Sequence, residues 1–523
     1  YLYMLFNSYE FIFIFLPVVL FVFHLIGKQG HHRVAIAWLV GASFFFYGWW
    51  NPAYLSLILF SILFNYSIGI LISNTSSHKL SKKSILIIGV ATNILVLGYY
   101  KYANFFVENL NSLSDTNLIL HKVILPLAIS FFTFQQIAYL IDAYKGETKE
   151  YNFLHYCLFV TFFPQLIAGP IVHHKEMLPQ FAKDVIYKLR SKHLAIGITI
   201  FALGLFKKVV LADGVSVYAT PVFDAAEAGI ILTFFEAWTG VLAYTFQIYF
   251  DFSGYSDMAI GIARMFGIRL PLNFNSPYKA TSIIDFWRRW HITLSRFLRD
   301  YLYIPLGGSR KGKVRRYINL MATMILGGLW HGAGWTFVLW GVLHGFYLMI
   351  NHGWRAVSKS RSKTKVSSFF AWLITFLALV VSWVPFRAES ILGANNLLKA
   401  MVGVNGISLP ISFENIFMNY GLSFPFNLIT FDGIFYNGLY GNDYIPIYWI
   451  LLLLLIATFF PNVQQLMRNH KPAFETYSKE EAKLGYIWAE WKQTASWAIF
   501  ISIIITISVL VLNGESEFLY FQF

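Results

Sequence analysis

Two histidines stand in segments where a titratable side chain needs an explanation. His331 lies within LGGLWHGAGWTF, residues 326–337, and His291 lies forty residues earlier in DFWRRWHITLSRFLRD, residues 285–300. Imidazole takes up and releases a proton near neutral pH, which suits general acid–base chemistry. An ionisable group inside a membrane span is costly, and such groups mark functional sites by default. The alternative is a histidine that is hydrogen-bonded within tight helix packing.

The composition indicates the environment of these residues. Of the 523 residues, 57% are hydrophobic and only 13% are charged, which is low for a soluble domain. A soluble chain cannot hide so much apolar surface, so the sequence predicts an all-α, polytopic membrane protein. The net charge of +14 resides in short basic segments between apolar runs. Such segments favour contact with membrane lipids, and we expect no nucleic-acid partner.

The elements that must position the histidines are apolar runs long enough to be membrane helices. They cover residues 11–27, 34–50, 53–73, 84–100, 123–143, 153–171, 194–213, 229–250, 318–350, 368–386, 446–461 and 495–512. The run at 318–350 is too long for one simple span, so it must tilt, break or double back. We expect about eleven spans plus one or two re-entrant pieces. They form a single membrane domain over residues 1–523, with the C-terminal spans in 368–512.

Basic loops predict the orientation of these spans. The segments at 28–33, 78–83, 310–316, 355–365 and 468–492 are expected to face the cytoplasm. After Lys399 no lysine or arginine occurs through residue 450, so the loop at 400–445 is expected on the outer side. No internal repeat is visible, whereas many secondary transporters are built from repeats.

Residues 283–316 predict an amphipathic interfacial helix that ends at Pro305 and Gly307. Its polar side carries Asp285, Arg288, Arg289, Ser295, Arg296, Arg299 and Asp300, and its apolar side carries Phe286, Trp290, Phe297 and Tyr301. Asp285–Arg289 and Arg296–Asp300 are spaced as i,i+4 ion pairs. From the pattern alone a surface anchor is favoured over a cationic rim for a phosphate-bearing substrate. His291 falls toward the apolar side, where a structural role is the commoner one.

The depth of His331 favours a functional role. A helix that continues from Arg316 places His331 ~22 Å further along, beyond the middle of a hydrocarbon core that is ~30 Å thick. Only a polar cavity makes that depth tolerable. The surrounding glycines, which permit close helix approach and leave room for a ligand, are Gly327, Gly328, Gly332 and Gly334. His344 is expected near the outer surface, in a structural role.

Two further segments interrupt apolar runs with polar or helix-breaking residues. In FQIYFDFSGYSD, residues 246–257, Asp251 and Asp257 directly follow a span. The segment is expected either to form a turn that lines the His331 cavity or to place Ser256 or Asp257 as the cap of a helix at 258–266. Residues 162–181, with two prolines and a glycine, are expected to be re-entrant. The adjacent His173 and His174 diverge by ~100° on a helix and do not predict a metal pair.

Several of these segments together resemble one family. DFWRRWHITLSRFLRDYLYIPLGGSR and GGLWHGAGWTFVLWGVLHG are similar to the signature segments of the membrane-bound O-acyltransferase (MBOAT) family. YFDFSGYSDMAIGIARMFGI, FNSPYKATSI and AGPIVHHKEMLPQF resemble its bacterial branch, which O-acetylates alginate and other exported polysaccharides. The resemblance covers nearly the whole chain, with the signature region at about 120–350.

The resemblance implies a fold, a reaction and a location. The family fold is a rosette of helices around a central funnel, in the bacterial inner (cytoplasmic) membrane. His331 matches the catalytic histidine and His291 the second signature position. The implied acyl donor is a cytoplasmic thioester, acetyl-coenzyme A or an acyl carrier protein, with no permanently bound cofactor and no metal. The implied partner is a periplasmic acetyltransferase similar to SGNH hydrolases.

That reaction assigns expected roles to the candidate residues. His331 acts as general base, or forms an acyl-histidine, while His291 orients the reactants or stabilises an oxyanion. The basic residues expected to hold the coenzyme A phosphates are Arg288, Arg289, Arg296, Arg299, Arg310 and Lys311. The other expected substrate contacts are Trp287, Trp330, Asp251, Ser253, Tyr255 and Asp257. Two alternatives without chemistry stay open: an acyl-donor conduit, and a scaffold that recruits the periplasmic enzyme through residues 400–445.

Overall fold

The computed structural model describes residues 4–74, 81–148, 152–358, 364–409, 411–420, 429–431, 445–474, 490–512 and 519. These residues are overwhelmingly helical, which confirms the all-α prediction. The described strands are two short segments, β1 (Ile407–Ser408) and β2 (Ile429–Thr430), which pair in parallel. Much of the loop expected at 400–445 lies outside the described residues.

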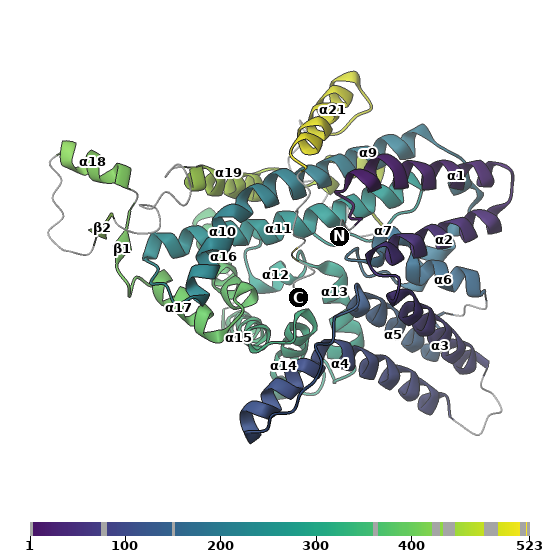
Figure 1. Cartoon of the computed structure of the whole chain (residues 1–523), viewed down its shortest axis with the longest axis horizontal. Coiled ribbons are helices and arrows are strands. Elements are labelled where there is room, and N and C mark those ends of the chain that lie inside the picture. Colours follow the sequence, from purple (N-terminus) through teal and green to yellow (C-terminus); the bar gives the residue numbers. More distant parts are fainter. Residues whose placement is uncertain are drawn as a thin grey trace.

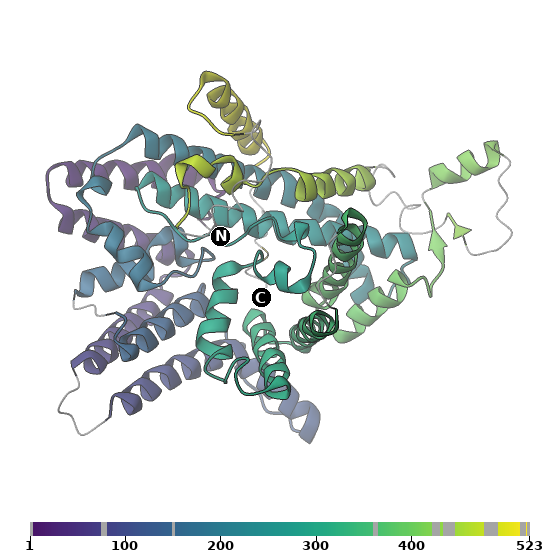
Figure 2. The same cartoon turned by 180° about the vertical axis from the view of Figure 1, so that it is seen from behind.

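Long helices surround a group of short ones at the centre of the molecule (Figure 1). The short central helices are α12 (Ile283–Trp287) and α13 (Ile292–Leu298). Around them in the same view lie α5 (Ile129–Lys145), α11 (Phe234–Met265), α14 (Lys313–His331) and α15 (Trp335–Val357), and the arrangement is seen from behind in Figure 2. The C-terminal elements α18 (Ile411–Asn419), β1 and β2 project to one side, away from this centre. The arrangement places the residues around His291 where several long helices converge.

The N-terminal part of the chain forms α1 to α5. Their bounds are η1 Phe11–Phe15 (π-helical), α1 Leu16–Lys28, α2 His32–Trp50, α3 Tyr54–Asn74, α4 Lys82–Ser114 and α5 Ile129–Lys145. The predicted span at 84–100 is too short, because α4 continues for fourteen further residues to Ser114. That continuation brings Lys101, just beyond the predicted span, into the interior of a helix.

The middle of the chain packs around α11 (Phe234–Met265), which is buried along most of its length. It lies against α9 (Ser191–Phe206), which continues through the π-helical η3 (Lys207–Ala212) into α10 (Asp213–Glu227). The two helices meet at glycines: a Cβ on Gly204 would lie 2.7 Å from the carbonyl oxygen of Gly254. Small residues at such crossings let helix backbones approach closely in membrane proteins.

The apolar run at 318–350 doubles back, as one of the sequence-based alternatives predicted. Its two arms are α14 (Lys313–His331) and α15 (Trp335–Val357), separated by Gly332–Gly334. Gly328 abuts the carbonyl of Phe337, and a Cβ on Gly345 would lie 2.6 Å from the sulfur of Met321, so the arms are antiparallel. Because the chain reverses, His344 returns into the interior and is fully buried. The expectation that it lies near the outer surface is wrong.

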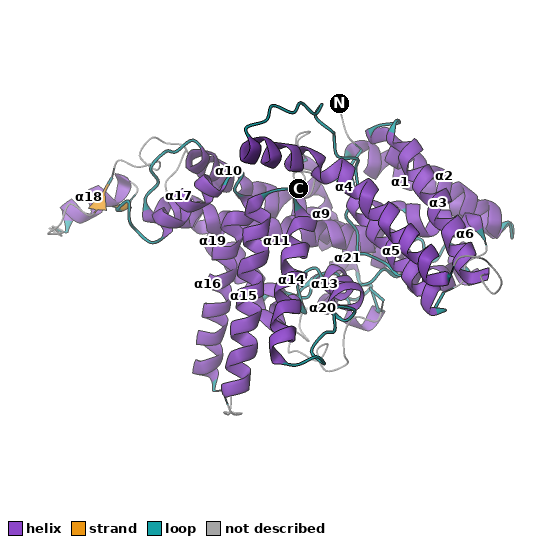
Figure 3. Ribbon diagram, turned by 90° about the horizontal axis from the view of Figure 1, so that it is seen from below, coloured by secondary structure: helices purple, strands orange, loops and turns teal. Residues whose placement is uncertain are grey.

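The remaining helices complete the framework. Their bounds are α6 Phe153–Thr161, α7 Phe163–Leu166, α8 His174–Phe181, η2 Asp184–Tyr187, η4 Pro277–Lys279, η5 Arg299–Tyr303, α16 Lys365–Arg387, α17 Ile391–Met401, α19 Ile445–Phe459, α20 Val463–Leu466, η6 Arg468–His470 and α21 Ala495–Leu510. In the side view the ends of α15 and α16 extend beyond the rest of the molecule (Figure 3). The broken, buried structure over 162–181 agrees with the expected interruption of that apolar run.

Two element predictions are wrong. Residues 283–316 do not begin with one continuous amphipathic helix, because α12 and α13 are separated by residues 288–291 and η5 follows directly. Residues 246–257 form no turn, and no new helix begins at 258, because the whole segment lies inside α11. In both places contacts from distant residues outweigh the local pattern.

Five helices in the described part of the chain are long and apolar enough to cross a membrane. They are Phe11–Lys28, Tyr54–Asn74, Lys82–Ser114, Ser191–Glu227 and Lys365–Arg387. Ile445–Phe459 and Ala495–Leu510 are apolar but shorter. The molecule is therefore a multi-pass membrane protein, while the predicted number of about eleven spans is not confirmed.

Candidate functional site

His331 is the last residue of α14 and lies in a cage of aromatic rings. The ring centroids of Trp330, Trp340 and Phe386 lie 5.0, 5.1 and 5.1 Å from that of His331, all in edge arrangements. The side chain is 6% exposed. The chain leaves the helix directly after His331, where Gly332 is extended, and a Cβ on Gly332 would collide with the ring of Phe337. A helix end thus places one imidazole among rings that exclude bulk water.

His291 lies beside His331. It stands at the break before α13 with a left-handed backbone, φ 41°, and it is completely buried. The centroids of the two imidazole rings are 6.5 Å apart. A non-glycine residue in this conformation costs on the order of 1–3 kcal/mol, so surrounding contacts must hold it there. The structure therefore brings together the two histidines that the sequence singled out.

Asn273 supplies those contacts. Its side-chain oxygen accepts from the hydroxyl of Thr293 at 2.9 Å and from the Thr293 backbone N–H at 3.3 Å. The same oxygen lies 3.1 Å from Nδ1 of His291. An amide oxygen only accepts, so the neutral ring carries its proton on Nδ1 and presents Nε2 as an acceptor. Sequence reasoning missed Asn273, although it stands in FNSPYKATSI, one of the segments that carries the family resemblance.

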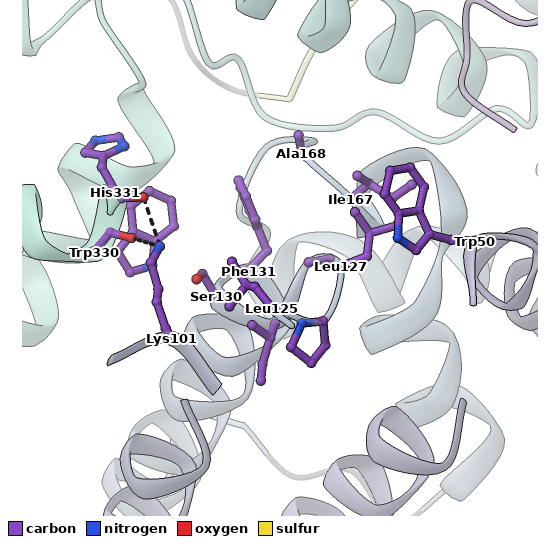
Figure 4. A pocket seen from close by; sticks show the side chains of 13 residues that line it. Trp50, Lys101, Leu125, Leu127, Ser130, Phe131, Ile167, Ala168, Trp330 and His331 are labelled. Carbon is purple, nitrogen blue, oxygen red and sulfur yellow. Dashed lines mark hydrogen bonds between the residues drawn. The ribbon is translucent and has the colours of Figure 1, made fainter. Parts of the chain in front are cut away.

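Two cavities share His331 as a wall. The larger, of about 90 Å³, is lined by Trp50, Lys101, Leu125, Pro126, Leu127, Ala128, Ile129, Ser130, Phe131, Ile167, Ala168, Trp330 and His331 (Figure 4). The smaller, of about 10 Å³, is lined by Ile248, Asp251, Phe252, Trp290, His331, Trp340, Trp383, Phe386 and Leu519. The imidazole thus separates a space beside α4 and α5 from a space beside α11 and α16. Both spaces border the same imidazole ring.

Lys101 of α4 reaches the wall of the larger cavity and binds the end of α14. Its Nζ donates to the backbone carbonyl oxygens of Trp330 and of His331, the latter at 2.9 Å, and Figure 4 shows both bonds. The neighbouring Tyr102 donates its hydroxyl to the carbonyl of Leu329 at 2.6 Å. Sequence reasoning missed Lys101. The signal that could have found it is a lone lysine in an otherwise apolar stretch, LGYYKYANFF.

The candidate residues of α11 differ in what they contact. Asp251 lines the smaller cavity and pairs with Lys208 at 2.6 Å, and Lys208 also binds Asp213 at 2.7 Å. Asp257 pairs with Lys207 at 2.6 Å. A buried carboxylate is tolerated when it is paired, which explains how both remain inside α11.

Ser253 and Tyr255, the other two candidates of α11, are both buried. The Tyr255 ring stacks on Phe6 with centroids 4.7 Å apart. Neither residue lines the two cavities at His331. A substrate contact through either residue stays a prediction.

The arginines of 285–300 form different pairs from those expected. Arg289 binds Asp285 at 3.0 Å, as predicted. Arg296 instead binds both carboxylate oxygens of Glu176 in α8, at 2.6 and 3.0 Å, so the predicted Arg296–Asp300 pair is wrong. Asp300 is bound by Arg299 at 2.7 Å. The bidentate bond to Glu176 fixes α13 to α8 and occupies the guanidinium.

The other members of the expected rim are open to solvent. Arg288, Arg299, Arg310 and Lys311 are exposed. Trp287 is half-buried and packs against His344 and Trp340, with ring centroids 5.2 and 5.8 Å away. Arg288, Arg310 and Lys311 remain available to a phosphate, whereas Arg296 and Arg299 are already paired.

Metal binding finds no support in the described residues. No group of three or more His, Cys, Asp or Glu side chains there could hold a metal ion. The adjacent His173 and His174 point to different partners: His173 contacts Tyr301 at 3.1 Å, and His174 contacts Thr148 at 2.7 Å. These histidines connect segments of the fold.

The fold and site define a multi-pass membrane protein with two buried, neighbouring histidines, one of which lines two cavities. Comparison with known proteins gives the class: the model of the MBOAT, membrane-bound O-acyltransferase family, matches residues 44–386. The chain belongs to this family and is an acyltransferase.

Similar proteins match over most of the chain. It is 41% identical to a peptidoglycan O-acetyltransferase of Helicobacter pylori, over 99% of this chain and 98% of that protein. It is 37% identical to a probable alginate O-acetylase AlgI of Pseudomonas putida, over 99% and 100%. To the corresponding protein of Pseudomonas aeruginosa it is 43% identical over 76% of this chain and 75% of that protein.

Proposed function

We propose that this chain is a membrane O-acetyltransferase that moves an acetyl group from a cytoplasmic thioester toward a hydroxyl group of an envelope polysaccharide. The observation that carries the proposal is the position of His331, the wall shared by two cavities and a neighbour of His291. The names of the similar proteins, which act on peptidoglycan or alginate, support the acceptor class.

The charge distribution supports a direction of transfer. The helices that reach the larger cavity have basic residues at their far ends, as with Lys82 of α4, Lys145 of α5 and Lys313 of α14. Basic ends face the cytoplasm, so the larger cavity lies toward the outer side. In this proposal the membrane is the bacterial inner membrane. The donor arrives from the basic side and the acceptor from the larger cavity.

The reaction needs one base and a fixed geometry. A nitrogen of His331 takes the proton of an acceptor hydroxyl as the oxygen attacks the thioester carbonyl. The C–S bond breaks when the tetrahedral intermediate collapses, and the leaving thiolate takes up the proton that His331 accepted. His291, held by Asn273 beside His331, orients this base toward the hydroxyl. Aromatic walls hold the reactants together, which supplies the proximity contribution.

Acetyl-coenzyme A is the donor that the exposed cations fit best. Its phosphates match the exposed Arg288, Arg310 and Lys311. Trp287, Arg289 and Arg299 are further contacts proposed for the donor, whereas Trp330 lines the larger cavity, on the acceptor side. The acceptor that receives the acetyl group on the outer side is either the polymer itself or a periplasmic acetyltransferase. Asp251 contributes to the wall of the smaller cavity.

A cellular experiment tests the function. In a bacterium whose own homologue is deleted, the chain should restore alkali-labile acetate on purified envelope polysaccharide. His331→Ala should restore none while reaching the membrane in the same amount. His121→Gln, which changes an exposed histidine outside both cavities, should restore full acetylation. Full acetylation with His331→Ala would refute the proposed role and favour a conduit or scaffold.

A further inference from the structure

The end of α14 has an unusual set of hydrogen-bond partners. The last four carbonyls of a helix have no partner within the helix. In α14 the carbonyl of Gly328 accepts from the Gly332 N–H at 3.3 Å. The other three, on Leu329, Trp330 and His331, accept from side chains of α4. Side chains of α4 thus cap the C-terminal end of α14, although the two helices are more than two hundred residues apart in the sequence.

Two adjacent residues of α4 make these contacts. Tyr102 binds the Leu329 carbonyl, and the Lys101 ammonium bridges the carbonyls of Trp330 and His331. The C-terminal end of a helix carries partial negative charge, so a cation is stabilised there. This contact explains how an ammonium group is tolerated among apolar helices. It also fixes the peptide groups on both sides of the His331 Cα.

The break after His331 makes this contact matter for the reaction. Beyond the helix end the backbone is extended at Gly332 and Gly334, and glycines restrain a chain least. The position of the imidazole therefore depends on what holds the final turn of α14. Lys101 also lines the larger cavity, where its ammonium lies beside the space that the acceptor is proposed to enter.

We infer that Lys101 is a positioning residue for His331: its ammonium clamps the final turn of α14 so that the imidazole faces the reacting groups. The inference rests on the proposed function of His331. The clamp fixes the base without binding the donor, so its loss lowers kcat and leaves the KM for acetyl-coenzyme A nearly unchanged. A displacement of about 1 Å at a catalytic group can cost on the order of 100-fold in rate.

The experiment uses the full-length protein purified in detergent and supplied with a polysaccharide as the acceptor hydroxyl, with release of free thiol from acetyl-coenzyme A as the readout. Lys101→Met keeps the length of the side chain and removes its charge and hydrogen bonds. Its kcat should fall about 100-fold, with KM within about threefold of the wild-type value. Lys101→Arg retains hydrogen-bond donors and the positive charge, so its kcat should be at least tenfold higher than that of Lys101→Met. Tyr102→Phe removes the neighbouring bond alone and should lower kcat less than Lys101→Met.

Lys279 offers a matched control. Its Nζ donates to the carbonyl of Phe460 at 2.6 Å, directly after the end of α19. Lys279 therefore also caps the C-terminal end of a helix. Lys279→Met loses the same kind of bond away from His331 and should keep kcat within about twofold. A Lys101→Met protein with wild-type kcat would refute the clamp. So would equal kcat losses in Lys101→Met and Lys279→Met.

The outcomes separate this inference from the proposed function. If wild-type protein releases no thiol, or if His331→Ala releases it at the wild-type rate, the proposed function fails. If His331→Ala is inactive while Lys101→Met is fully active, only the clamp fails. Should Lys101→Met not fold, as shown by gel filtration, Lys101→Gln decides, because its shorter side chain without charge cannot bridge the two carbonyls. A wild-type kcat in Lys101→Gln would overturn the clamp.

Discussion

The imidazole rings of His291 and His331 lie 6.5 Å apart, although forty residues separate them in the sequence. Each stands at a break in helical structure: His331 ends α14, and His291 precedes α13. The geometry of the pair therefore depends on the side chains that fix these two breaks. Substitutions at those side chains should change turnover more than they change folding.

Asn273 is the residue that fixes the break at His291. Asn273→Ala removes the acceptor for His291 Nδ1 and for Thr293, so we expect kcat to fall about 100-fold through loss of orientation. Thiol release from acetyl-coenzyme A measures this effect. Asn396→Ala removes an amide that donates to the Ala226 carbonyl and should leave kcat unchanged. A folded Asn273→Ala protein with wild-type kcat would show that His291 needs no support.

The hairpin of α14 and α15 depends on Gly328. An added methyl group at this position would collide with the Phe337 carbonyl, so Gly328→Ala should destabilise the protein by about 1–3 kcal/mol. Thermal unfolding in detergent, followed by intrinsic fluorescence, measures the change. Gly353→Ala, where a Cβ meets nothing within 4 Å, should be neutral or slightly stabilising. Equal melting temperatures for the two variants would contradict this packing.

The buried pair of Lys208 and Asp251 predicts a double-mutant effect. Lys208→Met leaves the Asp251 carboxylate buried without its cation and should cost about 3–5 kcal/mol of stability. Adding Asp251→Asn removes the stranded charge and should recover part of that loss. Unfolding midpoints of the two single variants and the double variant give the coupling. Additive effects would mean that the two side chains do not stabilise each other.

The exposed basic residues predict a donor-specific effect. Replacing Arg310 and Lys311 together by Gln should raise the KM for acetyl-coenzyme A about tenfold, because two exposed cations are lost from a phosphate site. The KM for a short acetyl thioester without phosphates, acetyl-N-acetylcysteamine, should not change. Kinetics with both donors provide the measurement. A similar rise for both donors would place these residues outside phosphate binding.

The sequence predicted the helical class, and it showed that 318–350 could not be one simple span, because both follow from local hydrophobicity and length. It did not decide among tilting, breaking and doubling back. His331 was found because an imidazole in an apolar run is conspicuous. The break at His291 was missed because its left-handed backbone is held by Asn273, a tertiary contact that no periodicity reveals.

The errors at 246–257 and at Arg296 have the same origin. In the sequence alone, Asp251 and Asp257 are typical of a turn. In the structure Lys208 and Lys207 neutralise them, so both carboxylates can lie inside a helix. Arg296 has an acidic residue at the correct helical spacing, yet its partner is Glu176 of another helix. Lys101 stood just beyond a predicted span, and only the full length of α4 places it inside.

Transfer of radiolabel from acetyl-coenzyme A by the purified protein tests the role of His331. Wild-type protein should release free coenzyme A and transfer the label to an added acceptor hydroxyl, while His331→Ala should do neither and still elute as folded protein. Wild-type rates of thiol release and label transfer in His331→Ala would contradict a reaction at this imidazole.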